Sequence, residues 1–165
     1  MLTPDKLLSI FDYHSETGTL TRKNSSKGYH GNREITRLND QGYLVTTLDG
    51  ETHRVHHLIW LIHYGYSVKE IDHINRNKSD NRVVNLRDCS HLQNCGNSGV
   101  RTTNTSGYKG VTFCKKTGRW KAQIGINYKN VNIGRFDTPE LAALAYNRMA
   151  LEHFGEFAYL NEVGS

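Results

Sequence analysis

Residues 71–94 contain the side-chain types that could hydrolyse a phosphodiester bond. Asp72 stands directly before His73, and Asn85 and Asn94 follow in the same stretch. A histidine titrates near neutral pH, so we interpret His73 as a general base that takes a proton from water, with Asn85 holding it in position. Carboxylate and amide oxygens suit Mg²⁺, which can act as a Lewis acid and stabilise the departing oxygen. We therefore interpret Asp72 and Asn94 as ligands of one divalent ion.

The elements around these residues should bring them towards one point. Two short β-prone segments flank a polar loop, and Ser90 can cap a helix that places Asn94 one turn in. The expected order is strand, loop, strand, helix. An aspartate beside a histidine is a common pair, so a surface or helix-capping role for each is the alternative interpretation.

Several short motifs surround these residues, and their order and spacing form a pattern. The segments are residues 55–60 (VHHLIW), 71–73 (IDH), 77–82 (NKSDNR), 85–87 (NLR) and 93–94 (QN). Together they resemble the HNH endonuclease family, in the branch found among phage and intron-encoded homing nucleases. The resemblance implies that His73 is the general base and Asn85 the residue that positions it. It also implies that Asp72 and Asn94 bind one ion, Mg²⁺ or Mn²⁺ rather than zinc, and that cleavage leaves a 5′ phosphate and a 3′ hydroxyl.

The remaining histidines and the cysteines suggest no second metal centre. We expect supporting roles in the core or hairpin for His53, His56, His57 and His63, and a helix-surface position for His91. Cys89, Cys95 and Cys114 form no Cys-x-x-Cys pair, which argues against a disulfide framework and against structural zinc.

Residues 108–161 have the pattern of three strands followed by a helix. The β-prone runs cover residues 110–113, 120–126 and 131–136, with turns at 115–118 and 127–130. Thr138 and Pro139 can begin a helix whose apolar residues recur at helical spacing until Gly155. Along the strands, alternation points Lys121, Gln123 and Asn132 away from that helix.

Several motifs within this segment have a known counterpart. They are residues 108–111 (YKGV), 118–120 (GRW), 122–124 (AQI), 133–138 (IGRFDT), 142–143 (AA), 145–147 (AYN) and 160–161 (LN). They resemble the AP2 DNA-binding domain, known from plant transcription factors and phage HNH nucleases. The resemblance implies an antiparallel sheet laid in the major groove with the helix packed behind. Thr112, Gly125 and Asn132 stand where the plant pattern reads bases with arginine and tryptophan, so its target sequence does not transfer.

The distribution of charge indicates a nucleic-acid partner. The formal net charge is +5, and from residue 99 onward nine Lys/Arg face five Asp/Glu. No acidic residue lies between Asp88 and Asp137. Such a stretch attracts polyanions through counterion release, although a merely solvated surface is the alternative. The charge distribution and the two family resemblances together predict double-stranded DNA as the partner. The candidate contacts are Arg76, Lys78, Arg87, Arg101, Lys109, Thr112, Lys115, Lys116, Arg119, Lys121, Gln123, Asn132 and Arg135.

The predicted fold class is α+β. An endonuclease domain spans residues 1–98, made of an N-terminal hairpin and helix part (1–55) and a ββα-metal core (56–98). A linker (99–107) and an AP2-like domain (108–165) follow. In the first part we expect a short helix at residues 7–11, hairpins at 13–22 and around Asp49-Gly50, and a helix at 57–64 ending at Gly65.

The sequence predicts a protein with no membrane span or secretory leader, acting in the cytoplasm of a phage-infected or bacterial cell as a monomer. The predicted function is a site-specific, homing-type DNA endonuclease. The alternative is a non-catalytic DNA-binding regulator with an inert nuclease fold. An RNA-binding module is disfavoured because the sheet lacks paired exposed aromatics. The target sequence and the choice between nicking and double-strand cleavage remain open.

Overall fold

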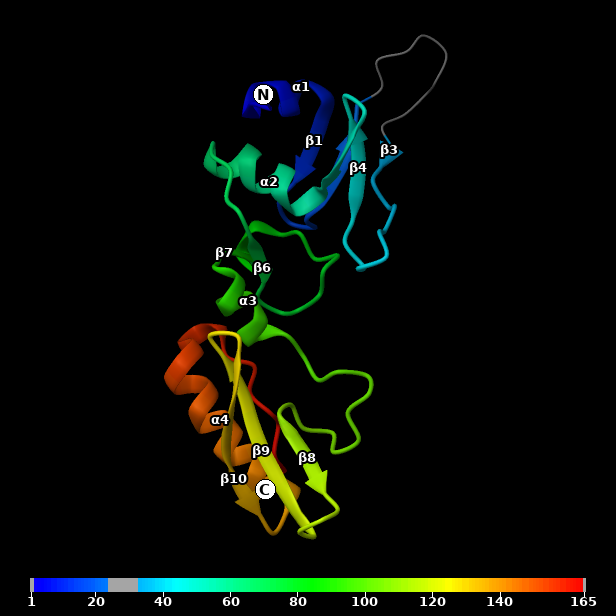
Figure 1. Ribbon diagram of the computed structural model, residues 1–165. Coiled ribbons are helices and arrows are strands. Elements are labelled where there is room, and N and C mark those ends of the chain that lie inside the picture. Colours follow the sequence, from blue (N-terminus) through cyan, green and yellow to red (C-terminus); the bar gives the residue numbers. More distant parts are fainter. Residues whose placement is uncertain (1, 24–32, 165) are drawn as a thin grey trace. The chain divides into compact units, whose positions relative to one another are not determined.

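The computed structural model describes residues 2–23 and 33–164, and it divides into two compact units, Met1–Cys89 and Ser90–Ser165 (Figure 1). Each unit combines helices with small antiparallel sheets, so the chain is of mixed α+β class. Met1, residues 24–32 and Ser165, which belong to the domains predicted from the sequence, lie outside the described residues. No helix in the described part of the chain is long and apolar enough to cross a membrane.

The first unit begins with a helix that leads directly into a sheet. Helix α1 (Pro4–Ile10) is capped by Thr3, whose hydroxyl accepts the N–H of Lys6 at 3.3 Å. Strands β1 (Phe11–His14), β2 (Thr19–Arg22) and β3 (Arg33–Glu34) form an antiparallel sheet in that order. The hairpin at residues 13–22 is confirmed. Phe11, which the sequence placed in the helix, begins β1 instead, because the backbone turns extended there.

A second hairpin runs into a buried helix. Strands β4 (Val45–Leu48) and β5 (Glu51–Arg54) flank Asp49 and Gly50, whose φ angles of 52° and 83° are those of the predicted type I′ turn. Helix α2 (Val55–Tyr64) follows without a linker and ends at Gly65, whose N–H donates to Leu61. The helix starts two residues earlier than predicted, so Val55 and His56 are also helical.

The short elements that carry the candidate site share one core with these hairpins. Strand β6 (Ile71–His73) pairs with β7 (Leu86–Asp88), and a 3₁₀ turn, η1 (Val83–Asn85), precedes β7. Ile71 and Leu86 are buried in a cluster that α1, β1, β2, β4 and α2 also supply. The other buried members are Leu7, Phe11, Leu20, Leu48, Val55, Leu58, Ile59, Trp60 and Leu61.

The second unit is a sheet with a long helix on one face. Helix α3 (His91–Asn97) begins at Ser90 with the predicted cap, completed by Gln93. Strands β8 (Val111–Cys114), β9 (Arg119–Ile126) and β10 (Lys129–Phe136) form an antiparallel sheet in which β9 is central. Helix α4 (Pro139–Phe154) is capped by Thr138 as predicted, and a 3₁₀ turn, η2 (Gly155–Phe157), follows it.

Close packing explains the small residues of this second unit. Ala142, Ala143 and Ala150 are completely buried against the sheet. The turn between β9 and β10 is tighter than predicted, because Asn127 and Tyr128 both take positive φ angles and β10 already begins at Lys129. All three cysteines of the chain are free thiols.

Two hairpin turns of the first unit contain a glycine with a positive φ angle. Replacing each glycine with alanine tests how tightly the turn is packed. Gly18 and Gly50 have similar φ angles of 74° and 83°, but a Cβ on Gly18 would lie 2.4 Å from the backbone nitrogen of Arg82. A Cβ on Gly50 would meet nothing within 4 Å. We expect Gly50→Ala to lower the free energy of unfolding by about 1–2 kcal/mol through backbone strain alone. Gly18→Ala should cost roughly 1–3 kcal/mol more, because of overpacking.

Urea unfolding followed by Trp60 fluorescence, in a Trp120→Phe background, measures this difference for the unit that contains both turns. Equal losses for the two alanine variants would show that the Gly18 turn does not press on residue 82.

Candidate functional site

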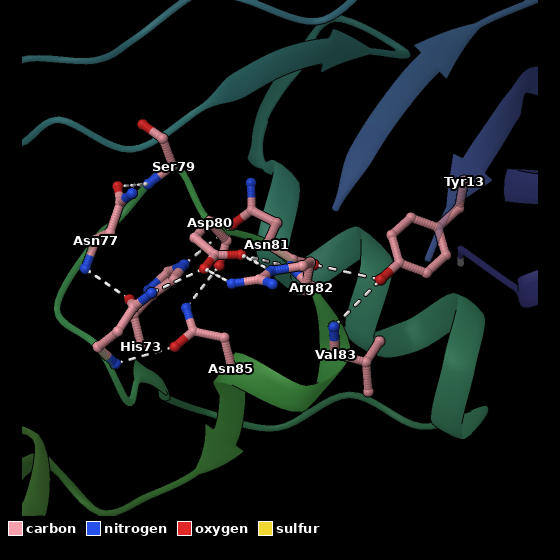
Figure 2. Close-up of polar contacts among 10 residues, drawn as sticks. Tyr13, His73, Asn77, Ser79, Asp80, Asn81, Arg82, Val83 and Asn85 are labelled. Carbon is pink, nitrogen blue, oxygen red and sulfur yellow. Dashed lines mark hydrogen bonds and ion pairs between the residues drawn. The ribbon is translucent and has the colours of Figure 1, made fainter. Parts of the chain in front are cut away.

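His73 ends β6 and is held by a buried hydrogen bond. Its side chain is 4% exposed, and Nε2 lies 3.0 Å from the amide oxygen of Asn81 (Figure 2). An amide oxygen only accepts, so Nε2 carries the proton and Nδ1 is the basic nitrogen of the neutral ring. Burial lowers the pKa of His73 below its usual value. The hydrogen bond that His73 donates to Asn81 and the charge of Asp72 raise this pKa, but they do not outweigh burial. The ring is therefore neutral near pH 7, as a general base must be.

Aromatic rings enclose the other side of His73. The ring of His56 meets it edge-on at 4.9 Å, and that of Tyr43 lies at 5.9 Å. His56 is 1% exposed, and its Nδ1 is buried with no hydrogen-bond partner among the described residues. Burial, followed by repulsion from His73 and His57 in their protonated forms, lowers the pKa of His56 to about 2. His56 thus forms a neutral wall of the site, which agrees with the core role predicted for it.

The other histidines for which the sequence predicts a role are less buried. His53 and His57 are half-buried, whereas His63 is exposed, because it lies on the last turn of α2 and faces outward. The core role predicted for His63 is therefore wrong. His91 is exposed at the start of α3, as expected for a helix surface.

Asn85 ties together the loop that follows His73. Its side-chain oxygen accepts the N–H of Asn75 at 2.9 Å, and its amide nitrogen donates to the carbonyl of Asp80 at 2.7 Å. Its backbone carbonyl accepts the N–H of Ile74. Both polar ends of the side chain thus fix residues 75–80, while Asn81 accepts a hydrogen bond from the His73 ring. Sequence analysis included Asn81 in the 77–82 motif but gave it no role in the site, because the sequence does not show which asparagine of the loop is buried.

The loop itself is held by short-range polar contacts. Arg82 pairs with Asp80 at 2.6 Å, and this hydrogen bond is the main cause that lowers the pKa of Asp80 to about 2. Asn75 and Asn77 each accept a backbone N–H two residues further on, which is the Asx-turn pattern. Arg76 is exposed with a φ of 65°. A run of Asn, Asp and Ser thus forms an ordered loop without apolar packing.

Asp72, the predicted metal ligand, is paired with Arg87 on the neighbouring strand. The two residues are opposite partners of the β6–β7 ladder. Oδ2 of Asp72 accepts from Nε and Nη2 of Arg87 at 2.9 and 2.7 Å. Asp72 is only 4% exposed, so this ion pair compensates a buried charge. Arg87, predicted to contact nucleic acid, therefore directs its guanidinium group to Asp72.

The donor set determines which kind of ion could bind at this site. Within residues 2–23 and 33–164, no group of three or more His, Cys, Asp or Glu side chains could hold a metal. An ion at Asp72 would therefore take the rest of its coordination from amide, water and phosphate oxygens. Mg²⁺ accepts such sparse protein ligation, whereas structural zinc needs a closed set of nitrogen and sulfur ligands. The residues present thus fit an oxygen-coordinated divalent ion. Asn94, the second predicted ligand, lies on α3 of the second unit.

In the second unit, five of the predicted DNA contacts lie on one face of the sheet. Thr112, Lys121 and Arg135 form one cross-strand row through their pairing on β8, β9 and β10. Gln123 and Asn132 form the next row. The neighbouring residues Ala122 and Ile124 point to the opposite face, where they are buried against α4. The sheet therefore presents one polar, basic face on the side away from its helix.

The other predicted contacts are placed differently. Lys115 and Lys116 are exposed in the β8–β9 turn, and Arg119 pairs with Asp137 at 2.9 Å. Arg101 is exposed and lines a hollow of about 410 Å³ together with Gln123 and Asn130.

Two predicted contacts are engaged within the protein. The ammonium group of Lys109 donates to the carbonyl of Gly96 at 2.7 Å, and so binds the C-terminal end of α3. In the first unit, Lys78 donates to the carbonyl of Gln41 at 2.8 Å and lies over the ring of Tyr43. Both lysines therefore stabilise the fold of their own units.

Models of known protein families match two separate parts of the chain. The family model for the HNH endonuclease matches residues 53–95, and that for the AP2 domain matches residues 106–156. The chain belongs to the HNH endonuclease family and carries an AP2 domain. No solved structure was found to match.

Three relatives show how far the similarity extends. An uncharacterized HNH endonuclease of Acanthamoeba polyphaga mimivirus is 38% identical over 93 residues, which is 56% of this chain and 47% of that protein. Protein 3.8 of Escherichia phage T7 is 33% identical over 88 residues, 53% of this chain and 72% of its own length. APETALA2-like protein 2 of Oryza sativa subsp. indica is 46% identical over 57 residues, 34% of this chain. The chain spans only 13% of the rice protein and about half of the mimivirus protein.

The buried histidine wall makes the stability of the first unit depend on pH. The pKa of His56 is about 2 in the folded state and about 6.5 when unfolded, so between these values only the unfolded state binds the proton. The stability contributed by a neutral His56 is therefore full above pH 6.5 and is lost as the pH falls. We expect His56 to contribute a loss of about 1.4 kcal/mol per pH unit below 6.5.

Unfolding by urea between pH 7 and 4.5 measures this slope, and His56→Gln should reduce it by that amount. An unchanged slope in the variant would contradict the assignment of a neutral, buried His56.

Proposed function

We propose that this protein is a metal-dependent, site-specific DNA endonuclease of the homing type that nicks or cuts double-stranded DNA. The observation that carries the proposal is the buried, neutral His73, fixed through Nε2 by Asn81 and adjacent to the buried carboxylate of Asp72. A neutral imidazole held through one nitrogen is basic at its second nitrogen, through which it can take a proton.

Each residue has a distinct task in the proposed reaction. His73 takes the proton from the attacking water at Nδ1. Asn81 holds the protonated Nε2, and Asn85 maintains the loop that carries Asn81. Arg87 fixes the carboxylate of Asp72 along the β6–β7 ladder.

The ion-binding residues follow the family resemblance. Asp72 would supply the anionic ligand to one divalent ion, with Mg²⁺ favoured by the oxygen donors. The ion, when bound, supplies Lewis-acid stabilisation of the phosphate and of the departing 3′ oxygen.

The polar sheet face is proposed to read the DNA target. Gln123 and Asn132 are suited to adenine, and Lys121 to guanine, when a sheet lies in the major groove. Arg135 shares the row of Lys121 and Thr112, while the exposed Lys115 and Lys116 are suited to phosphate contacts.

A specific observation supports a second candidate function. The ion pair with Arg87 already compensates the charge of Asp72, as it would in a DNA-binding regulator with an inert nuclease fold. Thermal unfolding distinguishes the two. A protein whose nuclease site binds Mg²⁺ should unfold at a higher temperature in millimolar Mg²⁺ than in EDTA, and Asp72→Asn should reduce this shift. An inert site predicts no shift in either protein.

The nuclease proposal is tested by replacing the general base. His73→Ala should abolish Mg²⁺-dependent relaxation of supercoiled DNA, by at least about a hundredfold, because general-base catalysis contributes factors of that order. DNA affinity, measured by gel shift, should stay unchanged. Cleavage by the variant at the wild-type rate, or loss of DNA binding together with cleavage, would contradict the role of His73.

The sheet face is tested with two exposed or half-exposed residues of the second unit. On a site selected from random duplexes, Gln123→Ala should weaken binding by about 1–3 kcal/mol and relax the preference at one position. Lys116→Ala should weaken binding to all sequences alike and lower the slope of affinity against salt by about 1. An unchanged preference in Gln123→Ala would show that another surface reads the sequence.

A further inference from the structure

The N-terminal hairpin makes direct contact with the segment that carries Asn81. The hydroxyl of Tyr13, on β1, accepts the backbone N–H of Val83 at 3.2 Å and donates to the backbone carbonyl of Asn81 at 3.4 Å. Figure 2 shows this hydroxyl reaching both backbone groups from outside the loop. These contacts join residues separated by 68 and 70 positions in the sequence.

The turn of the same hairpin presses on the same segment. Gly18 is buried, and a Cβ there would lie 2.4 Å from the nitrogen of Arg82 and 2.7 Å from the carbonyl carbon of Asn81. The turn and the backbone at residues 81–82 are therefore in close contact. Tyr13 and Gly18 hold this backbone from two adjacent points of one hairpin.

The side chain of Asn81 depends on that support. It is completely buried, and its amide nitrogen has no hydrogen-bond partner among the described residues. An unpaired buried donor is unfavourable, so the surroundings must impose this arrangement. In this position, the amide oxygen of Asn81 accepts the hydrogen bond from His73.

We propose that Tyr13 is a positioning residue for the nuclease reaction. Its hydroxyl holds the backbone at residues 81–83 in the place from which Asn81 fixes the ring of His73. This inference rests on the proposed function and assigns a part in it to the N-terminal hairpin. Tyr13 itself touches neither the attacking water nor the phosphate, and acts only through Asn81.

The direct test is the mobility of the Nε2 proton of His73. In full-length protein labelled with ¹⁵N-histidine, in metal-free buffer, this proton should exchange slowly with solvent. The signal is assigned by its loss in His73→Gln. Tyr13→Phe keeps the ring packing and removes only the hydroxyl, and we expect the exchange to become at least about tenfold faster, because the hydrogen bond opens more often.

A matched control comes from the same unit. Tyr64 is 42% exposed, and its hydroxyl makes no hydrogen bond to the described residues, so Tyr64→Phe should leave the exchange of the His73 proton unchanged. Exchange that is equal in wild type and Tyr13→Phe overturns the proposal. Equal acceleration in both phenylalanine variants also overturns it.

Cleavage gives a second readout. At saturating protein, the single-turnover rate of Tyr13→Phe should fall by about five- to tenfold, with DNA affinity unchanged, because a misplaced general base slows only the chemical step. Loss of DNA affinity to the same extent would indicate a merely structural role and overturn the proposal. If the wild-type protein cleaves no DNA, the proposed function fails, while proton exchange still decides whether Tyr13 positions His73.

Discussion

The 3.0 Å hydrogen bond between His73 and Asn81 is the interaction around which the candidate site is built. Both side chains are buried, and each is polar, so each needs a partner at a fixed place. Neither belongs to a large sheet or a long helix, because β6 has only three residues and Asn81 lies in a loop. The site must therefore take its rigidity from surrounding elements.

Those surrounding elements reach the site from several directions. The wall of His56 comes from α2, and Tyr13 comes from the N-terminal hairpin. Asn85 fixes the intervening loop, and Arg87 fixes Asp72 from the paired strand. The first unit thus surrounds a three-residue strand with contacts that are distant in the sequence. The second unit is simpler, because one helix lined with alanine packs on one face of its sheet and leaves the other face polar.

Local signals made much of this fold predictable. The Asp49-Gly50 turn, the helix end at Gly65 and the caps at Ser90 and Thr138 were all identified correctly, because each depends on the φ angle or side chain of one or two residues. The outward positions of Lys121, Gln123 and Asn132 followed from strand alternation.

Long-range contacts were not predictable in the same way. The hydroxyl of Tyr13 meets a backbone 68 residues away, and the ammonium group of Lys109 binds the end of a helix 13 residues before it. Lys109 and Arg87 were predicted as DNA contacts because residue type shows a charge but not its partner. Asn81 was missed for a related reason, since several asparagines in one loop are equivalent until one of them is buried.

The most direct test of the account is chemical rescue of His73→Gly on a bound DNA target in Mg²⁺. If His73 acts as a general base, removal of the ring should abolish cleavage, and added imidazole should restore part of it. Among substituted imidazoles of similar size, the rescued rate should rise with the pKa of the added base. A variant that binds DNA but is not rescued by any of these bases, or one that cleaves at the wild-type rate without them, would contradict the central role of His73.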